Sequence, residues 1–193
     1  QRSGVGKQTI QRYIEYLEAA FLLKRVFRVD QDGRRYQRER HFKVFLTNSA
    51  MYTGLFGARR PDDPEFGHLV ETALFAQRFH EDVRLNYARW GTDDCEVDLV
   101  ESLPSLKPLM ALEIKWSDKY ADRPESLKGL TKFVRGNRLA EAWATTRSTF
   151  GKTTIDGSEL RQWPAAVLTF HYGVRAVQGR LASHEARVEG VEA

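Results

Sequence analysis

Residues 95–116 read CEVDLVESLPSLKPLMALEIKW, two apolar runs separated by a short proline-containing stretch. Each run has the length and composition of a buried strand. The first run nevertheless contains Asp98, and the second contains Glu113 and Lys115. Burying charged side chains is costly unless they are paired, hydrogen-bonded or bound to a metal. The stretch therefore predicts two neighbouring strands that carry a functional site.

Strand geometry groups the charged residues of the second run. Side chains two positions apart on a strand face the same way, so we expect Glu113 and Lys115 to share one face. Leu112, Ile114 and Trp116 are expected to face the other side of the sheet. On its own, a Glu-x-Lys pair is typical of an ordinary solvent-exposed strand.

The first run adds a pair of acidic residues. We expect Glu96 and Asp98 to share a face, opposite Val97 and Leu99. If the two strands pair, Asp98 lies beside Glu113, at roughly 5 Å between opposed side chains. Two carboxylates this close repel one another unless a cation separates them or one is protonated. The pattern therefore indicates a site for Mg²⁺ or Mn²⁺, hard ions that prefer oxygen ligands.

Lys115 completes the chemistry expected of this site. A lysine beside a divalent cation can orient an attacking water or stabilise negative charge that develops on a phosphate. The reaction that these residue types support is phosphodiester hydrolysis.

The apolar periodicity around these strands predicts an α/β core. A helix is expected at about 64–80, followed by three strands (RLNYARW, CEVDLVE and PLMALEIKW), a helix around 127–134, and a strand at LAEAWATT. The run AAVLTFHY reads as a further strand, and the tail 183–193 reads as disordered. The expected core order is helix, three strands, helix, strand.

Residues 1–60 differ from the rest of the chain in charge. They carry 13 Lys and Arg against 5 Asp and Glu, whereas the remaining residues carry 17 against 21. A helix is predicted at about 7–20, followed by a basic hairpin around the Asp32-Gly33 turn signal. This order is typical of the second half of a winged helix. A small packing module and a plain solvated basic face are the alternatives.

A winged-helix-like segment would bind DNA through phosphate contacts. The stretch RRPDDPE marks the expected end of this segment, which gives segments at 1–60, 61–182 and 183–193. The expected nucleic-acid contacts are Gln8, Arg12, Arg28, Arg34, Arg35, Arg38 and Lys43.

Composition narrows the class of protein. No apolar run approaches about 18 residues and no signal peptide is visible, so we expect a cytoplasmic protein without a membrane partner. The single cysteine, Cys95, excludes internal disulfides and a cysteine-based zinc cluster. Two Gly-Lys motifs, SGVGKQT and TFGKTTID, lack the earlier glycine of a phosphate-binding P-loop. The chain also starts without methionine directly before a helical pattern, so it reads as a fragment with any ATP site upstream.

An acid followed by acid-x-lysine on the next strand, inside this core, resembles the PD-(D/E)XK nuclease superfamily with its restriction-endonuclease-like fold. Five segments resemble, in order, the C-terminal region of bacterial and archaeal AAA-type ATPases that carry a domain of unknown function of this nuclease fold. They are TIQRYIEYLEAAFLLKRV, FKVFLTNSAMYTGLFG, GHLVETALFAQ, YARWGTDDCEVDLV and ALEIKWSD. The resemblance covers most of residues 5–135.

The resemblance implies a role for each matching residue. Asp98 and Glu113 match the two metal-binding acids, Lys115 the lysine that positions the nucleophile, and Glu71 the helix acid that completes the metal site. An exposed helix residue is the alternative for Glu71. Val97 stands where the superfamily often has proline.

The implied function is a Mg²⁺- or Mn²⁺-dependent nuclease domain that acts on nucleic acid, expected to be DNA, with an ATPase domain upstream in the same chain. The alternative is a catalytically inactive nuclease-fold module that binds DNA or a protein partner for the ATPase.

Overall fold

The two apolar runs of the 95–116 stretch form neighbouring strands, β4 (Cys95–Ser102) and β5 (Pro108–Glu113). They pair antiparallel, with Leu99 opposite Leu112. The computed structural model describes residues 4–34, 41–81, 83–91, 95–103 and 107–189, with side chains described as far as residue 179. The predicted strand pair is confirmed.

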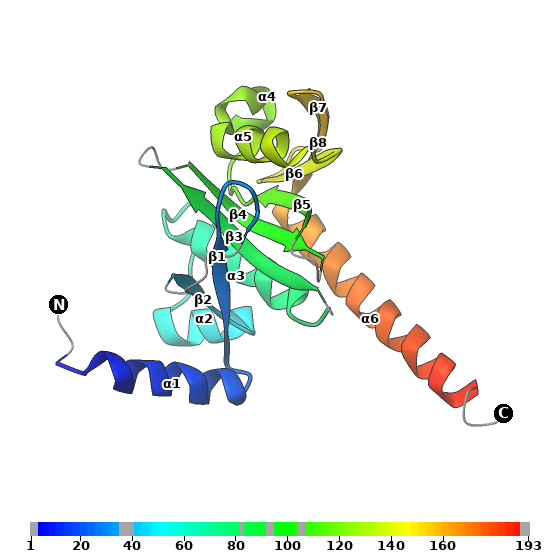
Figure 1. Cartoon of the computed structure of the whole chain (residues 1–193). Coiled ribbons are helices and arrows are strands. Elements are labelled where there is room, and N and C mark those ends of the chain that lie inside the picture. The colour runs from blue at the N-terminus through cyan, green and yellow to red at the C-terminus, as the bar shows by residue number, and fades with distance from the viewer. Residues whose placement is uncertain (1–3, 35–40, 82, 92–94, 104–106, 190–193) are drawn as a thin grey trace.

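All eight described strands belong to one mixed sheet, in the order β2-β1-β3-β4-β5-β6-β8-β7 (Figure 1). β1 runs parallel to β3, and β6 runs parallel to both β5 and β8, while the other neighbours are antiparallel. The remaining strands are β1 (Leu23–Val29), β2 (Phe42–Leu46), β3 (Arg84–Trp90), β6 (Glu141–Thr146), β7 (Gly151–Ile155) and β8 (Ser158–Pro164).

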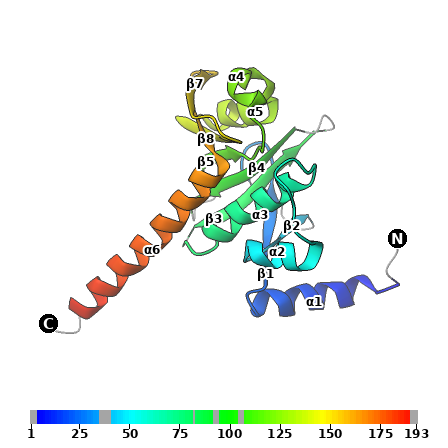
Figure 2. The same ribbon diagram turned by 180° about the vertical axis from the view of Figure 1, so that it is seen from behind.

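Helices cover both faces of the sheet (Figures 1 and 2). On one face, α3 (Phe66–Arg78) and α6 (Ala165–Glu189) bury an apolar cluster that includes Leu74, Phe75 and Leu168. On the other face, α5 (Lys128–Asn137) buries Leu130 and Phe133. The order α3, β3, β4, β5, α5, β6 confirms the predicted helix, three strands, helix, strand, with the short α4 (Lys119–Asp122) and a 3₁₀ turn before α5.

The C-terminal part of the chain differs from its prediction. The run AAVLTFHY is the start of α6, so the prediction of a strand there is wrong. Ala165, Leu168 and Tyr172 recur at helical spacing and are buried against α3 and the sheet, which a strand could not achieve with the same residues. The backbone remains helical as far as Glu189, so most of the tail predicted to be disordered continues α6. No helix in the described ranges is long and apolar enough to cross a membrane.

The basic hairpin is an integral part of the sheet. After the exposed α1 (Lys7–Ala19), β1 and β2 form the predicted hairpin strands, and β1 pairs with β3. The turn after β1 is held against the core, because Asn137 Nδ2 donates to the Gln31 carbonyl at 2.9 Å. Gly33 has a φ of +72°, and a Cβ at this position would overlap the Pro108 ring. The hairpin therefore does not form the separate wing expected for residues 1–60. α2 (Ser49–Phe56) follows it beside β2.

Candidate active site

A β-bulge in β4 determines where Asp98 lies. Asn86 of β3 is opposite Val100 and Ala88 is opposite Val97, so β4 contains one more residue than β3 between these pairs. As a result, Val97 packs in the cluster under α5, whereas Leu99 packs in the cluster under α3 and α6. The prediction that Val97 and Leu99 share a face is therefore wrong. Bulges often re-aim a side chain, and this one brings Asp98 to the end of the β4–β5 ladder.

The three residues proposed for catalysis come together at this point. Asp98 Oδ2 accepts a hydrogen bond from the Ile114 backbone N–H at 2.9 Å, just beyond the last residue of β5. Lys115 Nζ lies 2.7 Å from Glu113 Oε1 and 3.8 Å from Asp98 Oδ2. Asp98 therefore holds the backbone that carries Glu113 and Lys115, and Lys115 bridges the two carboxylates.

Along β5 and the residues after it, buried and polar side chains alternate as predicted. Leu112 and Ile114 are buried in the cluster under α3 and α6, and Trp116 packs against this cluster. Glu113 and Lys115 occupy the alternate positions, where only 12% and 29% of their side chains are exposed. Glu113 and Lys115 therefore belong to a half-buried polar site rather than an open strand surface.

Thr145 of β6 fixes the backbone of Lys115. Its Oγ1 accepts from the Lys115 N–H at 2.6 Å and donates to the Lys115 carbonyl at 2.7 Å. Thr145 is fully buried, so both contacts are protected from water. The Lys115 ammonium also lies 5.8 Å from the centre of the Tyr120 ring. The sequence contains no local signal for Thr145, because it is 30 positions from Lys115 in the chain.

A second lysine reaches the same carboxylates from the basic hairpin. Lys43 Nζ on β2 lies 3.1 Å from Glu71 Oε1, 2.7 Å from Glu96 Oε1 and 3.7 Å from Asp98 Oδ1. Glu71 on α3 therefore faces the site, as the resemblance implies. Lys43 was predicted as a nucleic-acid contact, but the structure places its ammonium among the acids. Glu96 was recognised only as a strand neighbour of Asp98.

The site has an excess of acidic groups. Its four carboxylates (Glu71, Glu96, Asp98 and Glu113) stand against the ammonium groups of Lys43 and Lys115 and the half-exposed guanidinium of Arg89, 3.7 Å from Glu96. Burial and the charge of Asp98 raise the pKa of Glu113 to about 7, although Lys115 opposes the shift. Burial also raises the pKa of Glu71, with Lys43 opposing the shift. Burial alone would lower the pKa of Lys43, but Glu71, Asp98 and Glu96 outweigh it, so this pKa is raised.

The donor set suits a hard divalent cation. All four acids offer oxygen ligands, and Glu113 Oε2 is buried without a hydrogen-bond partner in the part of the chain that the structure describes. Among the same residues, however, no group of three His, Cys, Asp or Glu side chains is ready to hold a metal ion. Lys43 instead lies among Glu71, Glu96 and Asp98. The residues fit the ion chemically, and the ion would have to displace an ammonium group.

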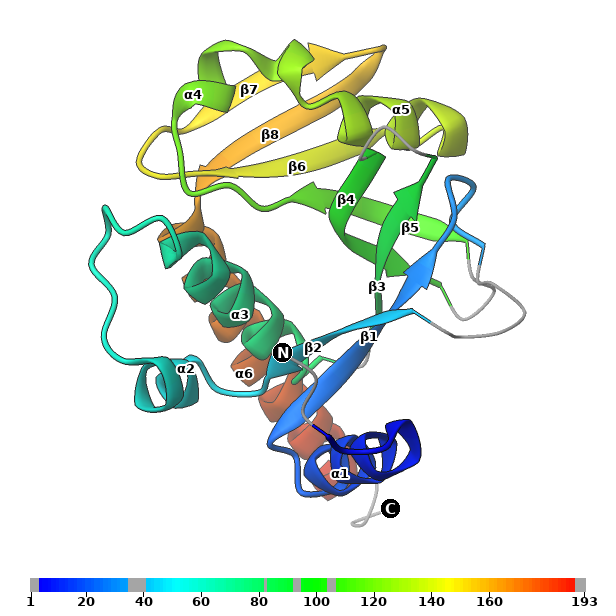
Figure 3. The ribbon, with the colours of Figure 1, turned by 90° about the vertical axis from the view of Figure 1, so that its left-hand side faces the viewer.

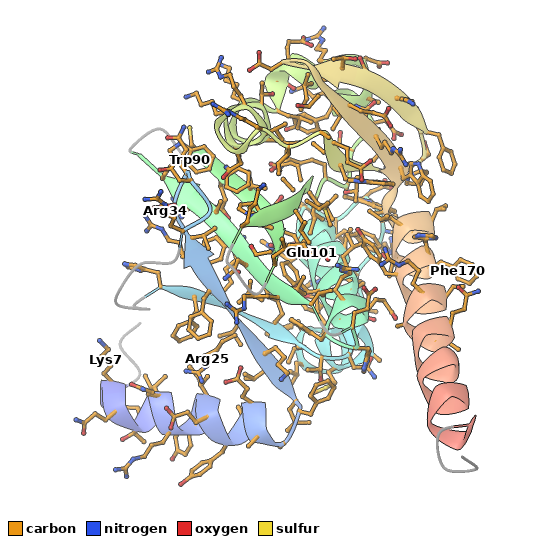
Figure 4. The ribbon with its side chains drawn as sticks, turned by 45° about the vertical axis from the view of Figure 1, so that its right-hand side comes forward. Lys7, Arg25, Arg34, Trp90, Glu101 and Phe170 are labelled. Carbon is orange, nitrogen blue, oxygen red and sulfur yellow. The ribbon has the colours of Figure 1, made fainter. Side chains whose placement is uncertain are left out.

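The other described residues that were predicted to contact nucleic acid lie on α1, on β1 and in the turn after β1. Gln8 and Arg12 are exposed on α1, and Arg34 is exposed in the turn after β1. Arg28 on β1 donates from Nε to the Arg89 carbonyl at 2.9 Å. Figure 4 shows Lys7, at the start of α1, well separated from Arg34. The start of α1 and the turn after β1 are therefore two separate basic regions. Arg35 and Arg38 lie outside the described residues.

Comparison with known proteins gives one match. Residues 1–62 are similar to a family described as a domain of unknown function, DUF8612. No curated protein and no solved structure matches the chain. The matched segment contains α1, the β1–β2 hairpin with Lys43, and α2. This similarity assigns no activity.

The raised pKa of Glu113 predicts how stability depends on pH. Its ordinary pKa of 4.5 rises to about 7 in the folded protein, so folding favours the protonated form. The stabilisation of the fold by protonated Glu113 is present at low pH and is lost as the pH rises to about 7. Without metal, we compare the unfolding free energy of Glu113→Gln with that of the wild type at pH 5 and at pH 8. We expect the difference to shift in favour of the variant by on the order of 2 kcal/mol from pH 5 to pH 8.

Urea unfolding in the presence of a chelator at both pH values measures this difference. Glu159→Gln is the control, because Glu159 is paired with Lys152 at the surface and its pKa is lowered. Equal Glu113→Gln effects at pH 5 and pH 8 would contradict the prediction.

Proposed function

We propose that this chain is a metal-dependent nuclease domain that hydrolyses phosphodiester bonds, with DNA as its substrate. One observation carries the proposal: Lys115 Nζ lies between Glu113 and Asp98, 2.7 and 3.8 Å from their oxygens, at the end of two paired strands. A half-buried lysine between two carboxylates has an evident use in phosphoryl chemistry. It has little value for stability, because buried ion pairs stabilise a fold only weakly.

The side chains have separate tasks in this reaction. Asp98, Glu113 and Glu71 would hold Mg²⁺ or Mn²⁺, and the ion would act as a Lewis acid on the phosphate. Lys115 orients the attacking water and stabilises negative charge on the phosphate. Water forms the new bond to phosphorus, the bond to the leaving oxygen breaks, and the products are a phosphate monoester and a hydroxyl. Thr145 keeps Lys115 in position through its backbone.

Two further features support the proposal. The order α3, β3, β4, β5, α5, β6 agrees with a restriction-endonuclease-like core. The resemblance to the C-terminal region of AAA-type ATPases suggests a larger cytoplasmic protein, in which an ATPase domain would move or gate the DNA. The hairpin arginines would then hold the DNA backbone.

The position of Lys43 favours a second candidate function. Because its ammonium already lies among Glu71, Glu96 and Asp98 and offsets part of their charge, this arrangement does not depend on a metal. A nuclease-fold module that binds DNA or a protein partner without cutting would need only this arrangement. That function predicts DNA binding, or partner binding, that Glu113→Gln leaves unchanged.

Cleavage of labelled DNA separates the two functions. Single-stranded, duplex and nicked DNA are incubated with the protein and Mg²⁺, Mn²⁺ or a chelator. For the nuclease, we expect cutting only with the metal, and a loss of at least about 100-fold in Glu113→Gln and in Lys115→Met.

Matched controls are available at the β7 edge of the sheet. Lys152 on β7 and Glu159 on β8 form a Glu–Lys pair at 2.8 Å, with 68% and 30% of their side chains exposed, so Glu159→Gln and Lys152→Met should cut like the wild type. DNA that is bound but not cut under every condition would reject the nuclease in favour of the binding module.

A further inference from the structure

A hollow of about 620 Å³ lies directly beside the carboxylates. It is bounded by β2, α2 and α3, which Figure 3 shows close together at one end of the sheet. Lys43 and Glu71 line the hollow and also belong to the candidate active site. A ligand in the hollow would therefore touch the groups that are proposed to act on phosphate. The volume is within the usual range for small-molecule sites.

One side of the hollow is aromatic. Tyr52 and Phe56 are one helical turn apart on α2, and their ring centres are 4.9 Å apart. Phe56 is 55% exposed, so its ring is available to a ligand. Phe45 lies in the same lining. An exposed ring such as that of Phe56 is suited to stacking against a planar base.

The same hollow carries cationic and polar groups. Arg59, just after α2, and His68 on α3 line it together with Lys43. Arg59 Nε is buried and has no hydrogen-bond partner among the described residues. A guanidinium with an unused donor is a good ligand for a phosphate oxygen. The one acid in the lining, Glu71, is paired with Lys43 at 3.1 Å, which reduces its repulsion of an anion.

We propose that this hollow binds one unpaired nucleotide of a nucleic-acid strand. The base stacks on Phe56, with the Tyr52 ring inclined to it by 57°, and a phosphate contacts Arg59 and His68. An aromatic surface and phosphate-binding groups side by side match the two halves of a nucleotide, and a paired base could not present its face to the rings. The strand would then continue past Lys43 to the carboxylates. This choice of ligand rests on the proposed nuclease function, and it makes strand ends or single-stranded regions the substrate.

Binding without cleavage tests the hollow by itself. A fluorescent oligothymidine of about ten nucleotides is titrated with the protein in a chelator, and anisotropy reports the dissociation constant. We expect Phe56→Ala to weaken binding about tenfold or more, since stacking supplies most of the contact. Arg59→Met should weaken it by a similar factor. A duplex of the same length should show less than about a twofold change in either variant.

Each variant has a neighbouring control. Leu55 is 65% exposed on the same helix and does not line the hollow, so Leu55→Ala should bind like the wild type. The exposed Arg60 controls for charge, so Arg60→Met should retain most of the affinity. Wild-type affinity in both Phe56→Ala and Arg59→Met would overturn the proposal. Equal weakening on the duplex would overturn the requirement for an unpaired base.

Two further arms identify the ligand and separate this proposal from the nuclease. Thymidine monophosphate should compete much more weakly than the strand. If it binds as tightly as the strand, the ligand of the hollow is a free nucleotide and not a strand. Cleavage is measured in parallel with Mn²⁺. If the protein cuts DNA but Phe56→Ala and Arg59→Met bind the strand like the wild type, only the proposal for the hollow is overturned. Binding that depends on Phe56 in a protein that never cuts overturns only the nuclease.

Discussion

Lys43→Met is expected to strengthen the binding of Mg²⁺ or Mn²⁺ by at least about tenfold. The lysine ammonium lies within 3.7 Å of oxygens from Glu71, Glu96 and Asp98, where a divalent cation would have to lie. Methionine keeps the aliphatic part of the side chain but removes the competing charge. The three carboxylates are then left with mutual repulsion that a metal relieves.

The same substitution should destabilise the protein when no metal is present. Removing one partner of a buried ion pair typically costs about 3–5 kcal/mol, and the 28% exposure of Lys43 reduces this to about 1–3 kcal/mol. Thermal unfolding should therefore show a lower Tm for Lys43→Met in a chelator and a larger rise with Mn²⁺ than in the wild type. Calorimetric titration with Mn²⁺ gives the affinity directly.

Lys152→Met is the matched control for this experiment. Lys152 also pairs with a glutamate, at 2.8 Å, but 68% of its side chain is exposed and it lies on the edge strand β7. It should change neither the Tm nor the response to Mn²⁺. A Lys43→Met protein with the metal response of the wild type would show that these carboxylates do not bind the ion, and it would favour the inactive module.

Arg78→Met is expected to cost about 3–5 kcal/mol of unfolding free energy, more than Lys43→Met. The Arg78 side chain is fully buried on α3 and contacts Glu81 and Glu101 through its two terminal nitrogens, each at 2.5 Å. Its guanidinium lies 4.6 Å from the centre of the Tyr172 ring on α6. Removing the charge leaves Glu101 without this cation, leaves Glu81 with Arg175 at 3.8 Å, and loosens the contact between α3 and α6.

Urea unfolding measures this loss, which corresponds to a fall in Tm of roughly 6–20 °C. The double variant Arg78→Met with Glu101→Gln should recover part of it, because one unpaired charge is removed along with the arginine. The control is Arg135→Met, since Arg135 pairs with Asp156 at 3.2 Å but 67% of its side chain is exposed. A loss below about 1 kcal/mol in Arg78→Met would contradict the expected role of this buried pair.

The ion-pair clusters around Arg78 and Lys43 differ in their surroundings. Arg78 is enclosed between the sheet and two helices, and Figure 4 shows its partner Glu101 in the interior while Phe170 on α6 points outward. Lys43 lies where a hollow meets the carboxylates and is partly open to solvent. The first cluster is closed to solvent, and the second is partly open to it.

The sequence predicted the strand pair and the meeting of its charged side chains because both depend on local rules. Two apolar runs joined by a short connection pair as neighbours, and alternation along β5 places Glu113 and Lys115 on one face. The helix 64–80 followed from apolar spacing, and it carries Glu71 towards the site. Prediction failed at AAVLTFHY, because a short apolar run fits both strand and helix until its packing partner is known.

By itself, the sequence determined the core order of helices and strands and the meeting of Asp98, Glu113 and Lys115. Only the tertiary structure decided that β4 bulges at Asp98, that Thr145 holds Lys115, and that the basic hairpin joins the sheet and brings Lys43 among the acids. The core order and the meeting of Asp98, Glu113 and Lys115 could be predicted because the periodicity of buried positions depends on residues that are neighbours in the sequence. The other features depend on contacts between segments far apart in the chain, whose register is settled only when the whole sheet packs against its helices.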